Sequence, residues 1–309
     1  MNKSKRFYFS KKITESPRLY RLSQLMSLML GAKIFPLVFY TLTLYVSTFF
    51  LFNQEESLRK FVFDYKVHGI ILCSILSIAA GGLINQFYDR ERDQLIRPFR
   101  SYLQSFTKQK YILYSYIILN TLSLGMAFML SPRIFVFFLI YQFFIWFYSH
   151  KLSRMLLVNN LVFVSLSLYP FFGLLVYYQH FSWQLFWMAI FLFLMLLIID
   201  ILKDYITRNA DRLFDYHTIP IVLGYRNTRR ILYGLLIANM LSALVIIQNY
   251  KTIGFLGYYF GGSIVILGFC LSFLSSYRKI SITHIINILR IWIFIGVIVM
   301  LFNGVYEKF

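Results

Sequence analysis

Long apolar stretches, separated by short polar intervals, recur along the whole chain of 309 residues. Most are about 17 to 25 residues long, which is the length that an α-helix needs to cross a membrane. Their apolar residues are continuous and do not alternate with polar ones, as they would in a β-barrel strand. The pattern therefore predicts an all-α, polytopic membrane protein with nine spans, over residues 33–52, 67–87, 111–130, 133–149, 157–178, 183–203, 231–249, 253–276 and 282–304.

The polar intervals leave no room for a soluble domain, because the longest is a basic N-terminal segment, residues 1–30. We therefore predict one membrane domain over residues 1–309. Within the N-terminal segment, Leu19 to Leu30 form an amphipathic stretch that we expect to lie at the cytoplasmic membrane interface. No small-residue cleavage pattern follows the first apolar run, so we expect that run to remain as a signal anchor.

Composition agrees with a membrane protein, since 59% of the residues are hydrophobic and 14% are charged. The net charge of +19 is better explained by cytoplasmic loops and anionic lipid than by nucleic acid. When the loops are assigned alternately to two faces, 24 of the 31 Lys and Arg residues fall on the side of the N-terminus and six on the other. This bias predicts a cytoplasmic N-terminus, an external C-terminus and a bacterial-type inner membrane location.

Cysteine and histidine give no sign of a disulfide framework, a zinc site or a haem site. Cys73 and Cys270 lie in apolar runs far apart, and the five histidines are scattered along the chain. The chemistry of the chain must therefore be sought among its acidic residues.

Three oxygen-bearing side chains, Asn85, Asp89 and Asp93, follow the second apolar run at intervals of four residues. On a helix this spacing stacks them on one face, about 6 Å apart along the axis. Hard oxygen ligands at the end of a membrane helix suit Mg²⁺, and acidic residues near a bilayer are functional by default. A solvated helix end balanced by Arg90 and Arg92 is the alternative, but it does not explain this register.

A second acidic cluster follows the sixth apolar run and consists of Asp200, Asp204, Asp211 and Asp215. Both clusters lie at the cytoplasmic ends of even-numbered spans, so we expect them at the same membrane face. Carboxylates there, surrounded by Arg and Lys, predict a metal–diphosphate site. A solvated loop of mixed charge is the alternative, and it fits Asp200 least because that residue lies in apolar sequence.

Two arginines, Arg97 and Arg100, follow the first cluster in the string Arg97-Pro98-Phe99-Arg100. Proline is expected to end the helix at this point. The arginines could then bind a diphosphate or anionic lipid, and the string favours neither.

Three motifs in order resemble those of the UbiA superfamily of intramembrane prenyltransferases, of the 4-hydroxybenzoate polyprenyltransferase type. The motifs are Asn85-x-x-x-Asp89-x-x-x-Asp93, then Tyr148-Ser149-His150-Lys151-Leu152 with Asn159-Asn160, and then Lys203-Asp204, Asp211 and Thr218-Ile219-Pro220. The resemblance covers essentially the whole chain. It implies nine transmembrane helices around a central cavity.

One position departs from the family pattern. Counting back from Thr218-Ile219-Pro220, Thr207 stands where the family usually has the first Asp of its second pair, while Asp211 fills the other position. Asp204, about one turn earlier, could supply the missing carboxylate, or the second metal could be held differently. His217 stands where many members have Lys.

The resemblance implies Mg²⁺-dependent transfer of a polyprenyl group from its diphosphate to a small, often aromatic acceptor. Asp89, Asp93, Asp211, Tyr148 and Lys151 are the catalytic candidates. Metal ligands would be Asn85, Asp89 and Asp93 for one ion and Asp204 and Asp211 for a second. Diphosphate ligands would be Arg97, Arg100, Lys151 and Lys203, with Tyr148 orienting an oxygen. Cleavage of the C–O bond would give an allylic cation that an electron-rich acceptor carbon attacks.

Other functions stay open at this stage. Phosphoribosyl diphosphate is another donor used in the superfamily, with a polyprenyl phosphate as acceptor, and haem farnesylation is conceivable. A degenerate scaffold is possible because of Thr207. A transporter would place its acids near the bilayer midplane, whereas these cluster at one face. The Asp-x-x-Asp-Gly-x-x-Ala-Arg string of CDP-alcohol phosphotransferases is absent from the sequence.

Overall fold

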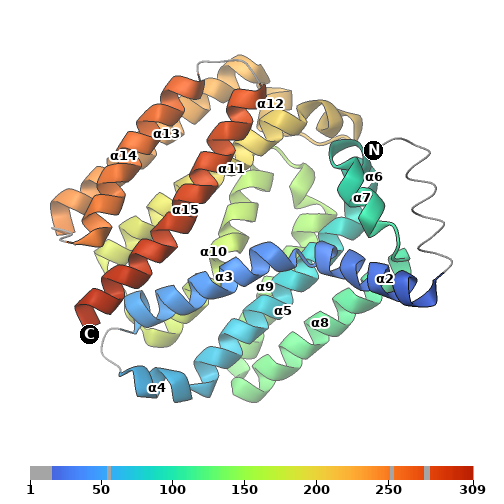
Figure 1. The fold of residues 1–309 in the computed structure, drawn as a ribbon, viewed down its shortest axis with the longest axis horizontal. Helices are drawn as coiled ribbons and strands as arrows, with labels where there is room; N and C mark the ends of the chain where they lie inside the picture. Colours follow the sequence, from blue (N-terminus) through green and yellow to red (C-terminus); the bar gives the residue numbers. More distant parts are fainter. Residues whose placement is uncertain (1–15, 54–56, 251–253, 275–278, 309) are drawn as a thin grey trace. The chain divides into compact units, whose positions relative to one another are not determined.

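The computed structural model describes residues 16–53, 57–250, 254–274 and 279–308, and nearly all of them are helical (Figure 1). In chain order the elements are α2 (Pro17–Gly31), α3 (Ile34–Ser47), the π-helix η1 (Thr48–Phe52), α4 (Leu58–Phe63), α5 (Tyr65–Tyr88), α6 (Arg90–Ile96), α7 (Pro98–Gln104), α8 (Gln109–Leu130), α9 (Pro132–His150), the 3₁₀ turn η2 (Leu152–Arg154), α10 (Val158–Tyr178), α11 (Trp183–Leu213), α12 (Ile219–Val222), α13 (Gly224–Tyr250), α14 (Phe255–Leu274) and α15 (Lys279–Lys308).

In the described residues, nine helical segments are long and apolar enough to cross a membrane. They are Ile34–Phe52, Tyr65–Tyr88, Gln109–Leu130, Pro132–His150, Val158–Tyr178, Trp183–Leu213, Gly224–Asn249, Phe255–Leu274 and Ser281–Tyr306. Each overlaps one predicted span, so the all-α, nine-span fold class is confirmed. The sixth ends at Leu213 rather than at residue 203, because helical hydrogen bonds continue into polar sequence that hydrophobicity does not mark.

The chain divides into two compact units, and the predicted single domain stays a prediction. Unit 1 comprises residues 1–41 and 72–150, and unit 2 comprises residues 42–71 and 151–309. Two of the three boundaries fall inside α3 and α5, and the third follows the end of α9. Each unit is described below by itself.

Polar side chains join the helices α5, α8 and α9 within unit 1. Ser77 and Ser123 lie 3.0 Å apart through their hydroxyl oxygens, and Gln142 Nε2 donates to Ser77 Oγ over 3.1 Å. Ser123 also donates to the Cys73 carbonyl on α5 over 3.0 Å. Hydrogen bonds of this kind fix the contacts between membrane helices, where apolar burial gives little preference for one partner.

Helix α2 packs on the segment that follows the first acidic motif. Ser27 Oγ donates to the Gln104 carbonyl over 2.9 Å, and Thr107 Oγ1 donates to the Gln24 carbonyl over 3.2 Å. The helix also leaves large apolar side chains exposed, namely Leu19, Leu22, Leu25, Met26 and Met29. The predicted place of this segment at the membrane interface stays a prediction.

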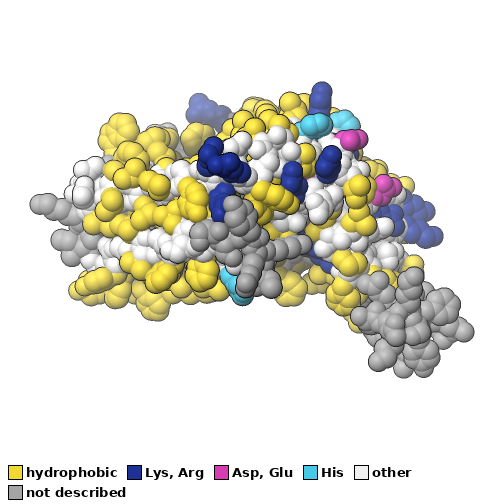
Figure 2. Space-filling view, turned by 90° about the horizontal axis from the view of Figure 1, so that it is seen from above, with side chains coloured by type: hydrophobic (Ala, Val, Ile, Leu, Met, Phe, Trp, Pro, Cys, Tyr) yellow, Lys and Arg dark blue, Asp and Glu magenta, His cyan; other side chains and the backbone are white. Residues whose placement is uncertain are grey.

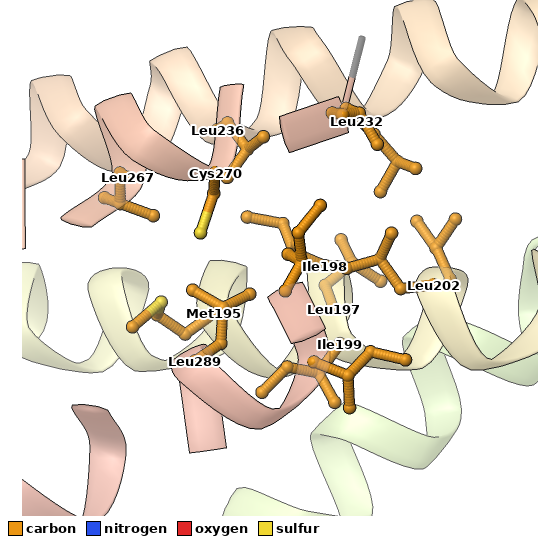
Figure 3. Close-up of a cluster of buried hydrophobic side chains, with 14 of the residues drawn as sticks. Met195, Leu197, Ile198, Ile199, Leu202, Leu232, Leu236, Leu267, Cys270 and Leu289 are labelled. Atoms are coloured by element: carbon orange, nitrogen blue, oxygen red, sulfur yellow. The ribbon is translucent and has the colours of Figure 1, made fainter. Parts of the chain in front are cut away.

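The core of unit 2 is built on α11, which packs against α10, α13 and α15, while α14 packs between α13 and α15. Side chains of these helices point toward one another in Figure 3, among them Met195, Cys270 and Leu289, and all three are fully buried. Because apolar residues surround α11 on several sides, its few polar residues stand out as candidates for function.

The surface agrees with a membrane environment. Apolar side chains cover much of the face seen in Figure 2. On the spanning helices large side chains such as Phe128, Met129 and Tyr258 are well exposed. Exposed apolar area on this scale marks a surface that is covered by lipid or by another chain rather than by water.

Candidate functional site

The first motif spans a short break between two helices of unit 1. α5 ends at Tyr88, and α6 begins at Arg90. The backbone hydrogen bonds nevertheless continue, since Asp89 N donates to the Asn85 carbonyl over 2.9 Å and Asp93 N donates to the Asp89 carbonyl over 2.8 Å. The four-residue register expected from the sequence is therefore kept across the break.

Within this motif the side chain of Asp89 is buried and has polar neighbours on its own helix face. Its Oδ2 accepts a hydrogen bond of 3.0 Å from Asn85 Nδ2. Arg92 Nη1 lies 3.5 Å from the same oxygen. An amide and a carboxylate thus meet one turn apart on the same face of the helix.

Asp93 lies in the next turn, where its carboxyl is partly buried. Burial and the neighbouring charge of Asp89 raise the pKa of the Asp93 carboxyl, and this outweighs the opposing effect of Arg97, Arg92 and Arg100. A cation beside Asp93 would offset both of these effects on its carboxyl. The donor set, two carboxylates and an amide, also fits Mg²⁺.

The two predicted diphosphate arginines differ in environment. Arg97 is exposed and separates α6 from α7, whose first residue is Pro98. Arg100 is partly buried, and its Nη2 donates to the Leu30 carbonyl near the end of α2 over 2.7 Å. Burial, reinforced by the charge of Arg97, lowers the pKa of the Arg100 guanidinium. Arg100 therefore anchors α2 to the motif segment in addition to any contact with a ligand.

A small cavity, lined mostly by polar residues, lies beside the first motif in unit 1. Its lining residues come from α5, α6, α7, α8 and the loop before α8, and they are Gln86, Arg90, Asp93, Ser101, Gln104, Ser105, Thr107 and Ile112. Gln104 Nε2 donates to Gln86 Oε1 over 3.2 Å in its wall. Asp93, a predicted metal ligand, therefore lines this cavity.

Tyr148 lies near the end of α9, and Lys151 follows that helix. Tyr148 is partly buried in the last turn of α9, and Lys151 is exposed at the start of unit 2. His150 stacks on Trp146, with ring centroids 5.4 Å apart, and meets the ring of Tyr88 edge-on at 5.4 Å. This packing joins the end of α9 to the end of α5, while the predicted roles of Tyr148 and Lys151 stay predictions.

The second motif lies in unit 2, on the long helix α11. Asp200, Asp204 and Asp211 belong to this one helix, which ends at Leu213. Asp215 lies beyond the helix, is exposed and has a positive φ of 57°. The i, i+4 relation expected for Asp211 and Asp215 on a helix is therefore not realised.

Asn159 and Asn160, at the start of α10, bind the carboxylates of α11. Asn160 Nδ2 lies 2.9 Å from Asp200 Oδ2 and 2.9 Å from Asp204 Oδ2, and Asn159 Nδ2 donates to the same Asp204 oxygen over 3.2 Å. Both asparagines are buried. The sequence showed them only as part of a motif and gave no sign of these partners, which lie at least 40 residues away.

Thr207 takes part in the second motif through its hydroxyl. Thr207 Oγ1 lies 2.6 Å from Asp211 Oδ2, and Asp211 is fully buried. Asp204 precedes Asp211 by seven residues, which corresponds to about 10.5 Å along a helix axis. Carboxylates that share one Mg²⁺ ion lie about 2.1 Å from it, so this separation places Asp204 and Asp211 in different parts of the motif.

Basic side chains accompany the second motif. Lys203 Nζ lies 3.4 Å from Asp200 Oδ1 and 5.1 Å from the centre of the Phe163 ring. Lys203, a predicted diphosphate ligand, is thus paired with an acid of its own helix.

A backbone hydrogen bond connects the loop after α11 to η2. His217 N donates to the Arg154 carbonyl over 2.9 Å.

Within the described residues, no three His, Cys, Asp or Glu side chains form a group that could hold a metal ion. A cation in either motif would therefore rely on two carboxylates, an amide oxygen and oxygens from water or a ligand. Mg²⁺ is commonly bound in this way, through one or two carboxylates together with phosphate oxygens.

The sequence profile of the UbiA prenyltransferase family matches residues 61–294. The chain belongs to this family. The family predicted from the three motifs is confirmed, and the match includes both acidic clusters.

Individual relatives agree with this assignment. The digeranylgeranylglyceryl phosphate synthase of Methanosphaera stadtmanae is 25% identical over 185 residues, which are 59% of this chain and 66% of that protein. The match thus spans just under two thirds of the relative's length.

Solved structures show the same fold at low sequence identity. A structure described as that of digeranylgeranylglyceryl phosphate synthase in membranes is 14% identical, covers 92% of this chain and 99% of its own, and has a TM-score of 0.67. A UbiA homologue from Archaeoglobus fulgidus, bound to GPP and Mg²⁺, is 15% identical, covers 89% and 99%, and has a TM-score of 0.60. The apo structure of a UbiA homologue from Aeropyrum pernix is 12% identical, covers 84% of this chain and 97% of its own, and has a TM-score of 0.60.

Proposed function

We propose that this chain transfers a polyprenyl group from a prenyl diphosphate to an acceptor inside the membrane, with Mg²⁺ as cofactor. The observation that carries the proposal is the row of Asn85, Asp89 and Asp93, which keeps helical register at the end of a membrane span. The Archaeoglobus fulgidus homologue, whose fold this chain shares, binds GPP together with Mg²⁺.

The residues of the first motif are assigned to one cation. Asp89 and Asp93 would hold it with their carboxylates, and Asn85 would add its amide oxygen. The bound ion would neutralise the charge that develops on the leaving diphosphate. Arg97, which is exposed next to the motif, is free to donate charge-assisted hydrogen bonds to phosphate oxygens.

The assignments in unit 2 rest on the sequence motifs. Asp204 and Asp211 remain the proposed carboxylate ligands of a second Mg²⁺ ion. Lys151 and Lys203 remain proposed diphosphate ligands. Arg100 in unit 1 would act on the diphosphate only in addition to its bond with the Leu30 carbonyl. Tyr148 is proposed to orient an oxygen of the substrate.

Two acceptor classes follow from the sequence and from the relatives. The resemblance of the motifs to the family implies an aromatic ring, whose electron-rich carbon attacks the allylic cation. The name of the Methanosphaera stadtmanae relative favours a glyceryl phosphate acceptor as the second candidate. A radiolabelled prenyl diphosphate offered with each acceptor in turn distinguishes them by the product formed.

The donor is tested by thermal unfolding of the detergent-purified protein with an unreactive farnesyl thiodiphosphate, with and without Mg²⁺. A ligand held at 100 times its dissociation constant stabilises the folded state by about 2.7 kcal/mol. We expect Mg²⁺-dependent stabilisation by this compound and none by phosphoribosyl diphosphate. Stabilisation by phosphoribosyl diphosphate alone would assign the chain to sugar-phosphate transfer, and no response to either would favour a degenerate scaffold.

The chain is an integral, multi-pass membrane protein, and its orientation is part of the proposal. We infer a cytoplasmic N-terminus and cytoplasmic acidic motifs from the distribution of Lys and Arg between the loops. This placement keeps the charged diphosphate near water while the prenyl tail lies among apolar helices.

A further inference from the structure

Two pairs of arginines lie in unit 2 where α11 ends and α13 begins. Arg208 and Arg212 are four residues apart on α11. Arg226 and Arg230 are four residues apart on α13. Side chains with this spacing lie on the same face of a helix. Because α11 and α13 pack against each other and α12 packs on both, each of the two helices contributes one pair of arginines to the same end of the unit.

The ring of Tyr225, at the start of α13, connects the two pairs. Its centre lies 4.2 Å from the guanidinium carbon of Arg208 and 4.5 Å from the centre of the Tyr205 ring. Arg226 follows Tyr225 directly, so its backbone is held next to the residue that Arg208 contacts. The aromatic contacts therefore keep the arginines of α11 and of α13 on one surface.

Carboxylates do not neutralise this surface. Among the residues that the structure describes, none of the four arginines forms an ion pair with Asp or Glu. Arg230 Nη1 donates instead to the amide oxygen of Asn227 over 3.4 Å. The acids between residues 208 and 230 are Asp211, which is fully buried, and Asp215, which is exposed. Four guanidinium groups thus share this region with one exposed carboxylate.

Large apolar side chains are exposed beside these arginines. Leu213, next to Arg212 at the end of α11, is 72% exposed. Val222 and Leu223 lie just before α13 and are 48% and 39% exposed. At the ends of membrane helices, apolar side chains next to arginines are typical of the membrane interface, where the former contact acyl chains and the latter contact lipid phosphates.

We propose that this region binds the phosphate headgroup of an anionic phospholipid. The binding surface, called the arginine surface below, consists of Arg208, Arg212, Arg226, Arg230, Leu213, Val222 and Leu223. Its guanidinium groups donate charge-assisted hydrogen bonds to phosphate oxygens, and its apolar side chains contact the upper part of the acyl chains.

The chemistry of the arginine surface favours this occupant over two others. A phosphate ion in solution would leave the three apolar side chains in water. A zwitterionic lipid would bring its own cation toward the guanidinium groups. The proposal goes beyond a general attraction of basic loops to anionic lipid because it assigns the lipid to one surface. It also goes beyond prenyl transfer, since none of these residues is a proposed ligand of the prenyl diphosphate.

The test is native mass spectrometry of the detergent-purified full chain, titrated with phosphatidylglycerol or with phosphatidylcholine of the same acyl chains. We expect phosphatidylcholine to bind about tenfold more weakly or worse. The double substitution Arg226→Gln with Arg230→Gln should weaken phosphatidylglycerol binding by about tenfold or more, because each basic residue near a membrane surface contributes to the affinity. Lys108→Gln with Lys110→Gln, which removes two exposed cations at the start of α8, is the matched control and should leave this binding unchanged.

A second double variant, Arg212→Gln with Leu213→Ser, should weaken the same binding from the side of α11. Melting temperatures without lipid show that the variants are folded. The proposal is overturned if both double variants of the arginine surface bind phosphatidylglycerol as tightly as the parent, if phosphatidylcholine binds equally well, or if the control variant loses as much affinity. It is also overturned if an equal concentration of glycerol 3-phosphate displaces the lipid, which would indicate a site for a phosphate ion.

Discussion

Uncharged side chains hold the acidic residues of both motifs. Asp89 accepts from the Asn85 amide, Asp204 accepts from two asparagine amides, and Asp211 accepts from the Thr207 hydroxyl. Such partners orient a carboxylate without cancelling its charge. Basic side chains also lie near two of the motif acids, with Arg92 at 3.5 Å from Asp89 and Lys203 at 3.4 Å from Asp200. At the scale of the residue, hydrogen bonds from uncharged groups therefore orient Asp89, Asp204 and Asp211.

Removal of the Asp89 charge should abolish the reaction. We expect Asp89→Asn to lower the rate of prenyl transfer at least a hundredfold, because an amide of the same shape cannot bind Mg²⁺ as a carboxylate does. The melting temperature in the absence of Mg²⁺ should change little. Glu91→Gln, an exposed acid two residues away, is the matched control and should retain activity. Full activity of both Asp89→Asn and Asp93→Asn would remove the first motif from the mechanism.

Thr207 should support Asp211 through its hydroxyl. Thr207→Val keeps the branched shape but removes the donor at 2.6 Å, which leaves a fully buried carboxylate with one partner fewer. Loss of such a bond costs about 1–3 kcal/mol. We expect a lower melting temperature for Thr207→Val and a value close to that of the parent for Thr207→Ser. Equal melting temperatures for all three proteins would show that the bond contributes nothing.

At the scale of the element, α2 and α5 meet by their backbones. A Cβ atom added at Gly82 on α5 would lie 2.6 Å from the Gly31 carbonyl oxygen at the end of α2. Arg100 donates to the Leu30 carbonyl in the same region, so the end of α2 is fixed from α5 and from α7. Small residues at such crossings allow the close approach that side chains would prevent.

The contact predicts opposite effects of the same substitution at two glycines. Gly82→Ala should destabilise the protein by about 1–3 kcal/mol, because the backbone of α2 must move away. Gly125→Ala should leave stability unchanged or raise it, since no atom lies within 4 Å of a Cβ at that position and alanine favours helix. Thermal unfolding in detergent measures both. If Gly82→Ala were as stable as Gly125→Ala, the close packing of α2 on α5 would be wrong.

At the scale of the whole molecule, hydrophobicity along the chain was sufficient to predict the nine spans, because each is a continuous apolar run. It missed the extension of α11 to Leu213, where polar residues continue the helix. The i, i+4 register of Asn85 and Asp89 was predictable because it is local. The contacts of Asn160 with α11, and of Arg100 with Leu30, join residues 40 to 70 positions apart, and a single sequence carries no local pattern for them.

The orientation in the membrane gives the last prediction. Arg133 lies in the first turn of α9, and Asn209 lies near the end of α11. Three spans, α9, α10 and α11, therefore separate these two exposed residues. An odd number of crossings places them on opposite faces. The excess of Lys and Arg predicts that Asn209 lies in the cytoplasm. Both native cysteines are buried, so a membrane-impermeant maleimide should leave the parent protein unlabelled.

We therefore expect Arg133→Cys to be labelled in intact cells and Asn209→Cys only after permeabilisation. Phe138→Cys, at a fully buried position on α9, is the control and should stay unlabelled in both conditions. The reverse pattern would invert the orientation and place the acidic motifs outside the cell. Labelling of both new cysteines in intact cells would contradict three crossings between them. The same two variants therefore distinguish a wrong orientation from a wrong number of spans.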